Sequence, residues 1–69
     1  MDDKQRQRWE LLFERAWSQG QMSVAVEAAR KLGSVERLVM VYERALSNGS
    51  VGDALSALWG IEAASKDQP

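Results

Sequence analysis

Two acidic side chains have a spacing that could support chemistry. Glu10 and Glu14 stand four residues apart, which places both carboxylates on one face of a helix, where they could ligate a metal ion. The chain contains no His and no Cys, so it lacks the nitrogen and sulfur ligands of most zinc sites. A carboxylate pair without such companions is typical of a solvated helix face. We therefore expect no metal site and no cofactor.

Serine and lysine side chains offer no other route to catalysis. A serine hydroxyl needs a neighbouring base to become a nucleophile, and His, the usual base, is absent. Lys4 and Lys31 fall in strongly polar segments, unlike the desolvated lysines that act as nucleophiles. Neither a phosphate-binding loop nor a dinucleotide fingerprint is present. The sequence thus predicts a protein that is not an enzyme.

The charge balance and the distribution of apolar residues bear on the class of partner. Nine basic and ten acidic residues give a net charge of -1, whereas domains that bind nucleic-acid phosphates are normally basic. No apolar run reaches the roughly 18–20 residues of a membrane span, and the segment MDDKQRQRWELL has no signal-peptide core. Because cysteine is also absent, we expect a cytoplasmic protein that does not bind membranes.

Three glycines divide the chain into segments with helical apolar spacing. Gly20, Gly33 and Gly49 can each adopt the left-handed conformation that ends a helix, and proline occurs only at Pro69. No segment shows the alternation of a strand. The predicted fold is all-α, with four short antiparallel helices over residues 4–19, 22–32, 34–48 and 51–64.

Short connections make successive helices neighbours. We therefore expect a single domain over residues 1–64, built from two helical hairpins (4–32 and 34–64), and a flexible tail at 65–69. Asp2 or Asp3, Ser34 and Ser50 are the predicted N-caps. The apolar stripe predicted for the fourth helix consists of Val51, Ala54, Leu55, Leu58, Trp59 and Ile61.

The two halves of the chain resemble each other. FERAWSQG at 13–20 and YERALSNG at 42–49 match closely, 29 positions apart. The same shift aligns Arg8 with Arg37, Arg15 with Arg44, Ala25 with Ala54 and Ala28 with Ala57. Any two amphipathic helical hairpins have the same spacing of apolar residues, so part of this similarity could arise by chance. That spacing does not explain why the polar residues Glu14 and Glu43 also match. We interpret the halves as two copies of a helix–Gly–helix unit.

The segment YERAL at 42–46 resembles the second-helix signature of tetratricopeptide and half-a-tetratricopeptide repeats. The likeness extends over residues 22–46, with small Ala29, a turn at Gly33, and Tyr42 in the second helix. The chain departs from the family in its 29-residue unit, where the family has 34, and in Leu38, where a small residue is usual. The resemblance implies a helical surface that binds another protein. Two hairpins leave faces uncovered, so we also expect a homodimer.

Apolar side chains on the polar sides of the helices mark a candidate contact surface. Leu11 and Met40 are equivalent in the repeat, and both lie opposite the apolar stripe of their helices. Arginine, methionine and tryptophan are enriched at interfaces and their energetic centres. The predicted partner-binding residues are Leu11, Arg15, Arg37, Met40, Arg44 and Trp59. The expected function is that of a regulator, inhibitor or adaptor that occludes a larger protein.

DNA binding is the alternative function. AARKLGS at 28–34 resembles the first helix and turn of a helix-turn-helix, with the turn at Gly33 and the second helix over 34–48. That second helix offers Arg37 as its one good reader of bases or phosphates, while Glu36 repels phosphate. The composition therefore favours a protein partner over nucleic acid.

Overall fold

The computed structural model describes residues 1–66 as four α-helices, and no strand is present in that range. The all-α prediction is confirmed. The helices are α1 (Asp3–Ser18), α2 (Met22–Leu32), α3 (Val35–Ser47) and α4 (Val51–Lys66). α4 extends two residues beyond the predicted helix end at residue 64, and residues 67–69 of the predicted tail lie outside the described range.

Side-chain caps mark where α1 and α3 begin. The Asp2 carboxylate accepts a hydrogen bond from the backbone N–H of Gln5 at 2.8 Å. The Ser34 hydroxyl accepts one from the N–H of Arg37 at 3.2 Å. Each bond satisfies a donor of the first turn that has no partner within its helix. The caps predicted at Asp2 and Ser34 are confirmed.

The helix ends share one device. Gly33 (φ +63°) and Gly49 (φ +78°) adopt the left-handed conformation, as does Gly20. In each turn the next N–H donates to the carbonyl of an alanine five residues back, and the pairs are Gln21–Ala16, Ser34–Ala29 and Ser50–Ala45. This is the Schellman arrangement, in which a positive φ lets the chain satisfy its last carbonyls while it reverses. The octets at 13–20 and 42–49 therefore end in the same turn.

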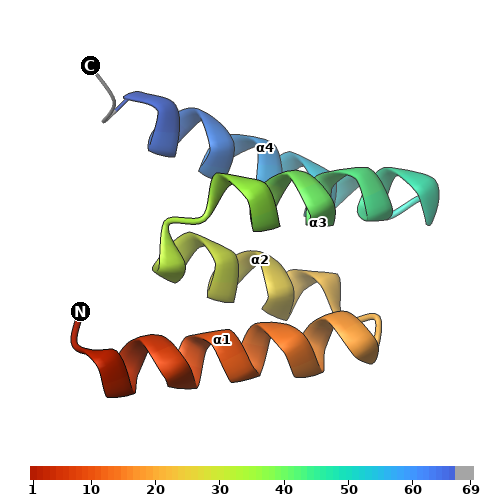
Figure 1. The fold of residues 1–69 in the computed structure, drawn as a ribbon. Coiled ribbons are helices and arrows are strands. Elements are labelled where there is room, and N and C mark those ends of the chain that lie inside the picture. The colour runs from red at the N-terminus through yellow and green to blue at the C-terminus, as the bar shows by residue number, and fades with distance from the viewer. Residues whose placement is uncertain (67–69) are drawn as a thin grey trace.

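The helices form a flat stack that measures 35 × 31 × 14 Å along its principal axes. Successive helices run antiparallel, and α1 and α4 lie at opposite ends of the stack (Figure 1). The closest packing joins α1 to α2 and α3 to α4, pairs that we call hairpin 1 and hairpin 2. α2 also packs on both α3 and α4, so it touches every other helix. No Cα atom of α1 lies within 8 Å of a Cα atom of α3.

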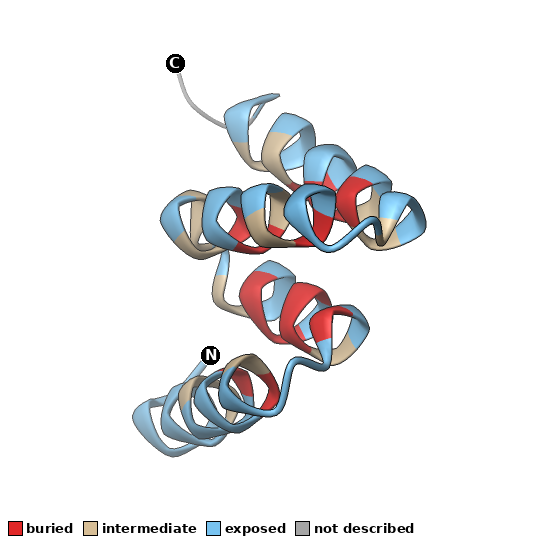
Figure 2. Cartoon of the chain, turned by 90° about the vertical axis from the view of Figure 1, so that its right-hand side faces the viewer, coloured by how far each residue is buried: buried red, intermediate tan, exposed pale blue. Residues whose placement is uncertain are grey.

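The core lies on the facing sides of the helices, where Figure 2 shows the buried residues. It is built largely of small side chains, which allow close helix approach. Its members are Phe13, Ala16, Met22, Ala25, Val26, Ala28, Ala29, Leu38, Val41, Ala45, Ala54 and Ala57. Trp9, Trp17 and Tyr42 pack against its edge.

The stripe predicted for the fourth helix is right at Ala54, which is buried, and at Ile61, which packs against the core, but wrong at its other members. α4 buries Ala54, Ala57 and Gly60, whereas the larger Val51, Leu55, Leu58 and Trp59 are exposed. A Cβ at Gly60 would lie 3.0 Å from a Leu38 methyl and 3.1 Å from Cγ of Arg30. These distances show how close α4 lies to its neighbours, and only small residues permit that approach.

Candidate interaction surfaces

Arg37 joins α3 to α1 through its guanidinium group. The guanidinium carbon lies 5.5 Å from the ring centroid of Phe13, a cation–π distance. Its Nη2 atom is 3.7 Å from a carboxylate oxygen of Glu10. Both partners belong to α1, so Arg37 connects helices whose backbones remain apart. The side chain predicted to read DNA or contact a partner is engaged within the molecule.

Arg44 makes the second connection, two turns further along α3. Its Nη1 atom donates to the backbone carbonyl oxygen of Trp17 at 2.6 Å, and its guanidinium carbon lies 4.6 Å from the Trp17 ring centroid. The Trp17 ring stacks in turn on Phe13, with centroids 6.0 Å apart and planes inclined by 18°. Arg37 and Arg44 therefore hold one aromatic pair of α1 at two points.

A hollow of about 280 Å³ lies between α1 and α3 beside these contacts. Met40, predicted as a partner contact, is part of its wall and is partly exposed. The remaining lining residues are Phe13, Glu14, Ser34, Glu36 and Arg37. Most of the lining is polar, with two carboxylates beside the apolar Phe13 and Met40, and the hollow is large enough for one side chain of a partner.

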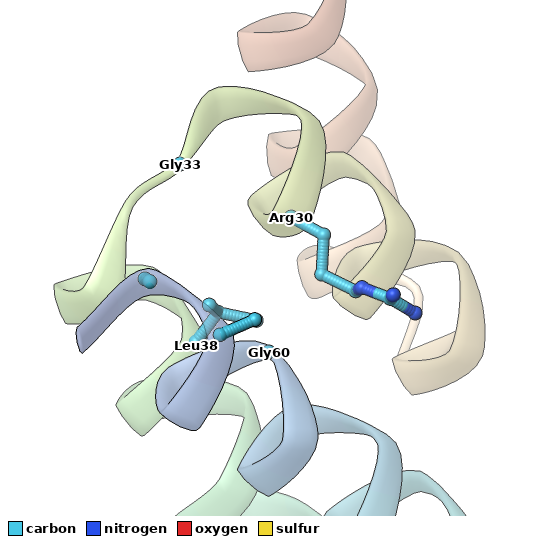
Figure 3. A pocket seen from close by; sticks show the side chains of 6 residues that line it. Arg30, Gly33, Leu38 and Gly60 are labelled. Carbon is cyan, nitrogen blue, oxygen red and sulfur yellow. The ribbon is translucent and has the colours of Figure 1, made fainter. Parts of the chain in front are cut away.

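A second hollow, of about 270 Å³, marks the place where hairpin 2 crosses hairpin 1. Arg30 and Gly33 from α2 face Leu38 and Gly60 across it, and the guanidinium group of Arg30 points away (Figure 3). Ala63 and Ala64 complete the lining. No acidic or nucleophilic group lines it, so it is a packing seam between the hairpins.

The outer face of α1 combines basic and apolar side chains. Arg8, Leu11, Leu12 and Arg15 are all exposed, and Leu11 is 61 % exposed. Leu11 and Arg15 were predicted as partner contacts. We define Arg8, Leu11, Leu12 and Arg15 as the α1 end face.

The outer face of α4 exposes four large apolar side chains. Val51, Leu55, Leu58 and Trp59 repeat at helical spacing on the side opposite the buried small residues. Trp59 was predicted as a contact; the other three were assigned to the core. Their signal is visible in the sequence, because α4 is apolar almost all round, as in helices that are covered on both sides. We call these four residues the α4 end face.

The six predicted contact residues do not form one surface. Leu11 and Arg15 lie at one end of the stack, and Trp59 lies at the other (Figure 1). Arg37, Met40 and Arg44 lie between them, on the side of α3 that faces α1.

The two carboxylates that were considered as metal ligands, Glu10 and Glu14, have different contacts. Glu10 pairs with Arg37, whereas Glu14 lines the hollow between α1 and α3. No group of three or more potential metal ligands occurs among residues 1–66. None of the helices described is long and apolar enough to cross a membrane.

Comparison with known proteins returned no significant relative: no protein-family model, no curated sequence and no solved structure matches the chain.

Proposed function

We propose that this chain is a non-enzymatic module that binds another protein and acts as a regulator, inhibitor or adaptor in the cytoplasm. The observation that carries the proposal is the α4 end face, where Leu55, Leu58 and Trp59 expose apolar surface on one side of one helix. Contiguous exposed apolar surface marks interaction sites, and a partly exposed tryptophan is a common energetic anchor. The resemblance of residues 42–46 to tetratricopeptide repeats supports the same class of function.

The segment of the partner that binds the α4 end face is a helix or a helical hairpin. A row of apolar side chains at helical spacing fits the apolar face of another helix. Arg37, the one basic reader on α3, is held by Glu10 and Phe13. This engagement favours a protein partner over the helix-turn-helix alternative, in which that side chain must reach a base or phosphate.

The experiment is an affinity capture from the native host with matched surface variants. Wild type and Leu11→Asp should retain the same host protein, one other than the chain itself, and Trp59→Asp should lose it, because a carboxylate cannot be buried in an apolar contact without a large desolvation cost. Circular dichroism should show equal helicity for all three. Retention by Trp59→Asp would reject the α4 end face as the binding site.

A further inference from the structure

We propose that the chain assembles head to tail with copies of itself: hairpin 1 of one copy, with its α1 end face, packs on the α4 end face and the adjoining surface of α3 of the next copy. This inference rests on the proposed function and names a partner of that site: hairpin 1 of a second copy. The chain forms the same kind of contact internally, between hairpin 1 and hairpin 2, and exposes both halves of it again at the ends of the stack.

The α4 end face is the second copy of a surface that is already buried in the molecule. The pairs related by 29 residues are Met22 and Val51, Val26 and Leu55, and Ala29 and Leu58. The three members in α2 are at most 3 % exposed, whereas those in α4 are 39 % or more exposed. Hairpin 2 packs on α2, and no corresponding hairpin packs on α4 within residues 1–66. A further hairpin of the same repeat is therefore the occupant that this surface fits.

The α1 end face is the repeat equivalent of the α3 surface that binds hairpin 1 inside the molecule. Arg37 and Arg44 attach α3 to the aromatic pair of α1. Their equivalents Arg8 and Arg15 are exposed and form no ion pair or cation–π contact within the described residues. These two guanidinium groups are therefore free to make the equivalent contacts with α3 of a second copy.

The surface that would receive these arginines is present on α3. Tyr42 is equivalent to Phe13, and Leu46 is equivalent to Trp17. In the proposed contact, Arg8 stacks on the Tyr42 ring, and Arg15 donates to the Leu46 carbonyl at the end of the helix. Tyr42 is partly exposed and Leu46 is exposed, so both can be reached from outside.

At one position, the residues of the internal contact between the hairpins differ in size and charge from their equivalents in the proposed contact between two chains. Inside the molecule, Gly60 of α4 lies against the side chain of Arg30, and Gly33, which follows α2, lines the same hollow (Figure 3). The equivalent of Gly60 in hairpin 1 is Lys31 of α2, whose side chain could not enter so narrow a seam beside Arg30.

The opposing residues change in a way that accommodates this lysine. Trp59 stands at the position equivalent to Arg30, and Glu62 at the position equivalent to Gly33. Lys31 of the second copy thus meets an indole ring and a carboxylate in place of a guanidinium group and a glycine. Cation–π attraction and opposite charge both favour the pairing. Lys31 has these complementary partners only when hairpin 1 of one copy meets α4 of another. This complementarity favours head-to-tail contact over a symmetric contact between two α4 end faces.

A head-to-tail contact joins different surfaces of the two copies. Such heterologous contacts leave one free surface of each kind at the ends of every assembly, so they continue unless the rotation between copies closes a ring. The mass of the assembly should therefore rise with concentration beyond that of a dimer.

The test uses two variants that each disable one surface. Leu55→Glu disables the α4 end face, and the double variant Arg8→Glu/Arg15→Glu disables the α1 end face. All three side chains are exposed, so both variants should fold, as circular dichroism would show. Light scattering should give the mass of one chain for each variant alone and of two chains for their equimolar mixture, because one intact surface of each kind remains.

The other outcomes overturn the proposal. A dimer of Arg8→Glu/Arg15→Glu alone would indicate symmetric pairing of α4 end faces, and a mixture that stays monomeric would exclude the head-to-tail contact. If the wild type is monomeric, and if Trp59→Asp nevertheless abolishes binding of the host partner, self-association is rejected and the proposed function is retained. A charge exchange adds a second measurement: Lys31→Glu should weaken self-association, and Lys31→Glu/Glu62→Lys should restore part of it.

Discussion

Arg44 of hairpin 2 contacts α1, whereas its repeat equivalent Arg15 is exposed. Comparing the same substitution at both positions therefore measures what the contacts of Arg44 contribute to stability. Arg44→Ala removes a short charge-assisted hydrogen bond to Trp17 and a guanidinium–indole contact. We expect a loss of about 1–2 kcal/mol in the free energy of unfolding. The matched change Arg15→Ala removes an exposed side chain and should cost less than about 0.5 kcal/mol. Urea unfolding at low protein concentration tests both; equal losses would contradict the role assigned to Arg44.

Two helical glycines of α4 should respond oppositely to the same substitution. Gly52 has open space around the Cβ position, so Gly52→Ala should stabilise the chain by about 0.5 kcal/mol through helix propensity. At Gly60 the added carbon would lie 3.0–3.2 Å from two methyls of buried Leu38 and from Cγ of Arg30. Gly60→Ala should therefore cost about 1–2 kcal/mol through overpacking. Thermal unfolding of the two variants gives the signs, and a stabilising Gly60→Ala would show that the seam is looser than these distances indicate.

At the scale of the helices, their ends could be predicted from sequence to within two residues. Asp2 and Ser34 cap α1 and α3, and glycines end the first three helices, because these signals act over a single turn. The buried face of α4 could not be predicted from hydrophobicity, because large apolar residues lie on one side and alanines and a glycine on the other. Helix packing selected the small side. The alignment of Ala25 and Ala28 with Ala54 and Ala57 was the sequence signal for that choice.

The contact surfaces were harder to predict, because they depend on which helices meet. Arg37 and Arg44 lie on the polar side of α3 in the helical pattern, yet that side faces α1. Periodicity describes one helix at a time and does not show that an aromatic pair lies opposite. The shared Arg15 and Arg44 did indicate a repeated role, but only the structure shows that one copy is engaged and the other is exposed.

The surroundings of α3 determine what to expect of DNA binding. Its Leu38, Val41 and Ala45 are buried, and Arg37 is engaged by α1. We expect no salt-sensitive retention of the chain on immobilised duplex DNA at physiological ionic strength, since few cations remain to displace counterions from α3. Retention that falls steeply with salt and disappears in Arg37→Ala would restore the helix-turn-helix interpretation.

At the scale of the whole molecule, self-association should couple stability to concentration. A contact that forms only between folded chains stabilises them by mass action. The Tm of wild type should therefore rise as the protein concentration is increased a hundredfold, whereas the Tm of Leu55→Glu should stay constant. Differential scanning calorimetry over that range provides the measurement, and a constant Tm for wild type would argue against assembly through the α4 end face.

The position of α2 in the stack has a consequence for how the molecule opens. α2 is the helix that contacts all three others, so its amide groups exchange with solvent only when both hairpin contacts are lost. The first two turns of α1, by contrast, consist of exposed residues up to Arg8 and can fray alone. Hydrogen exchange should be slowest around Ala28 and Ala29 and fastest over residues 3–8. A chain this small would then show a gradient of protection that runs outward from its second helix.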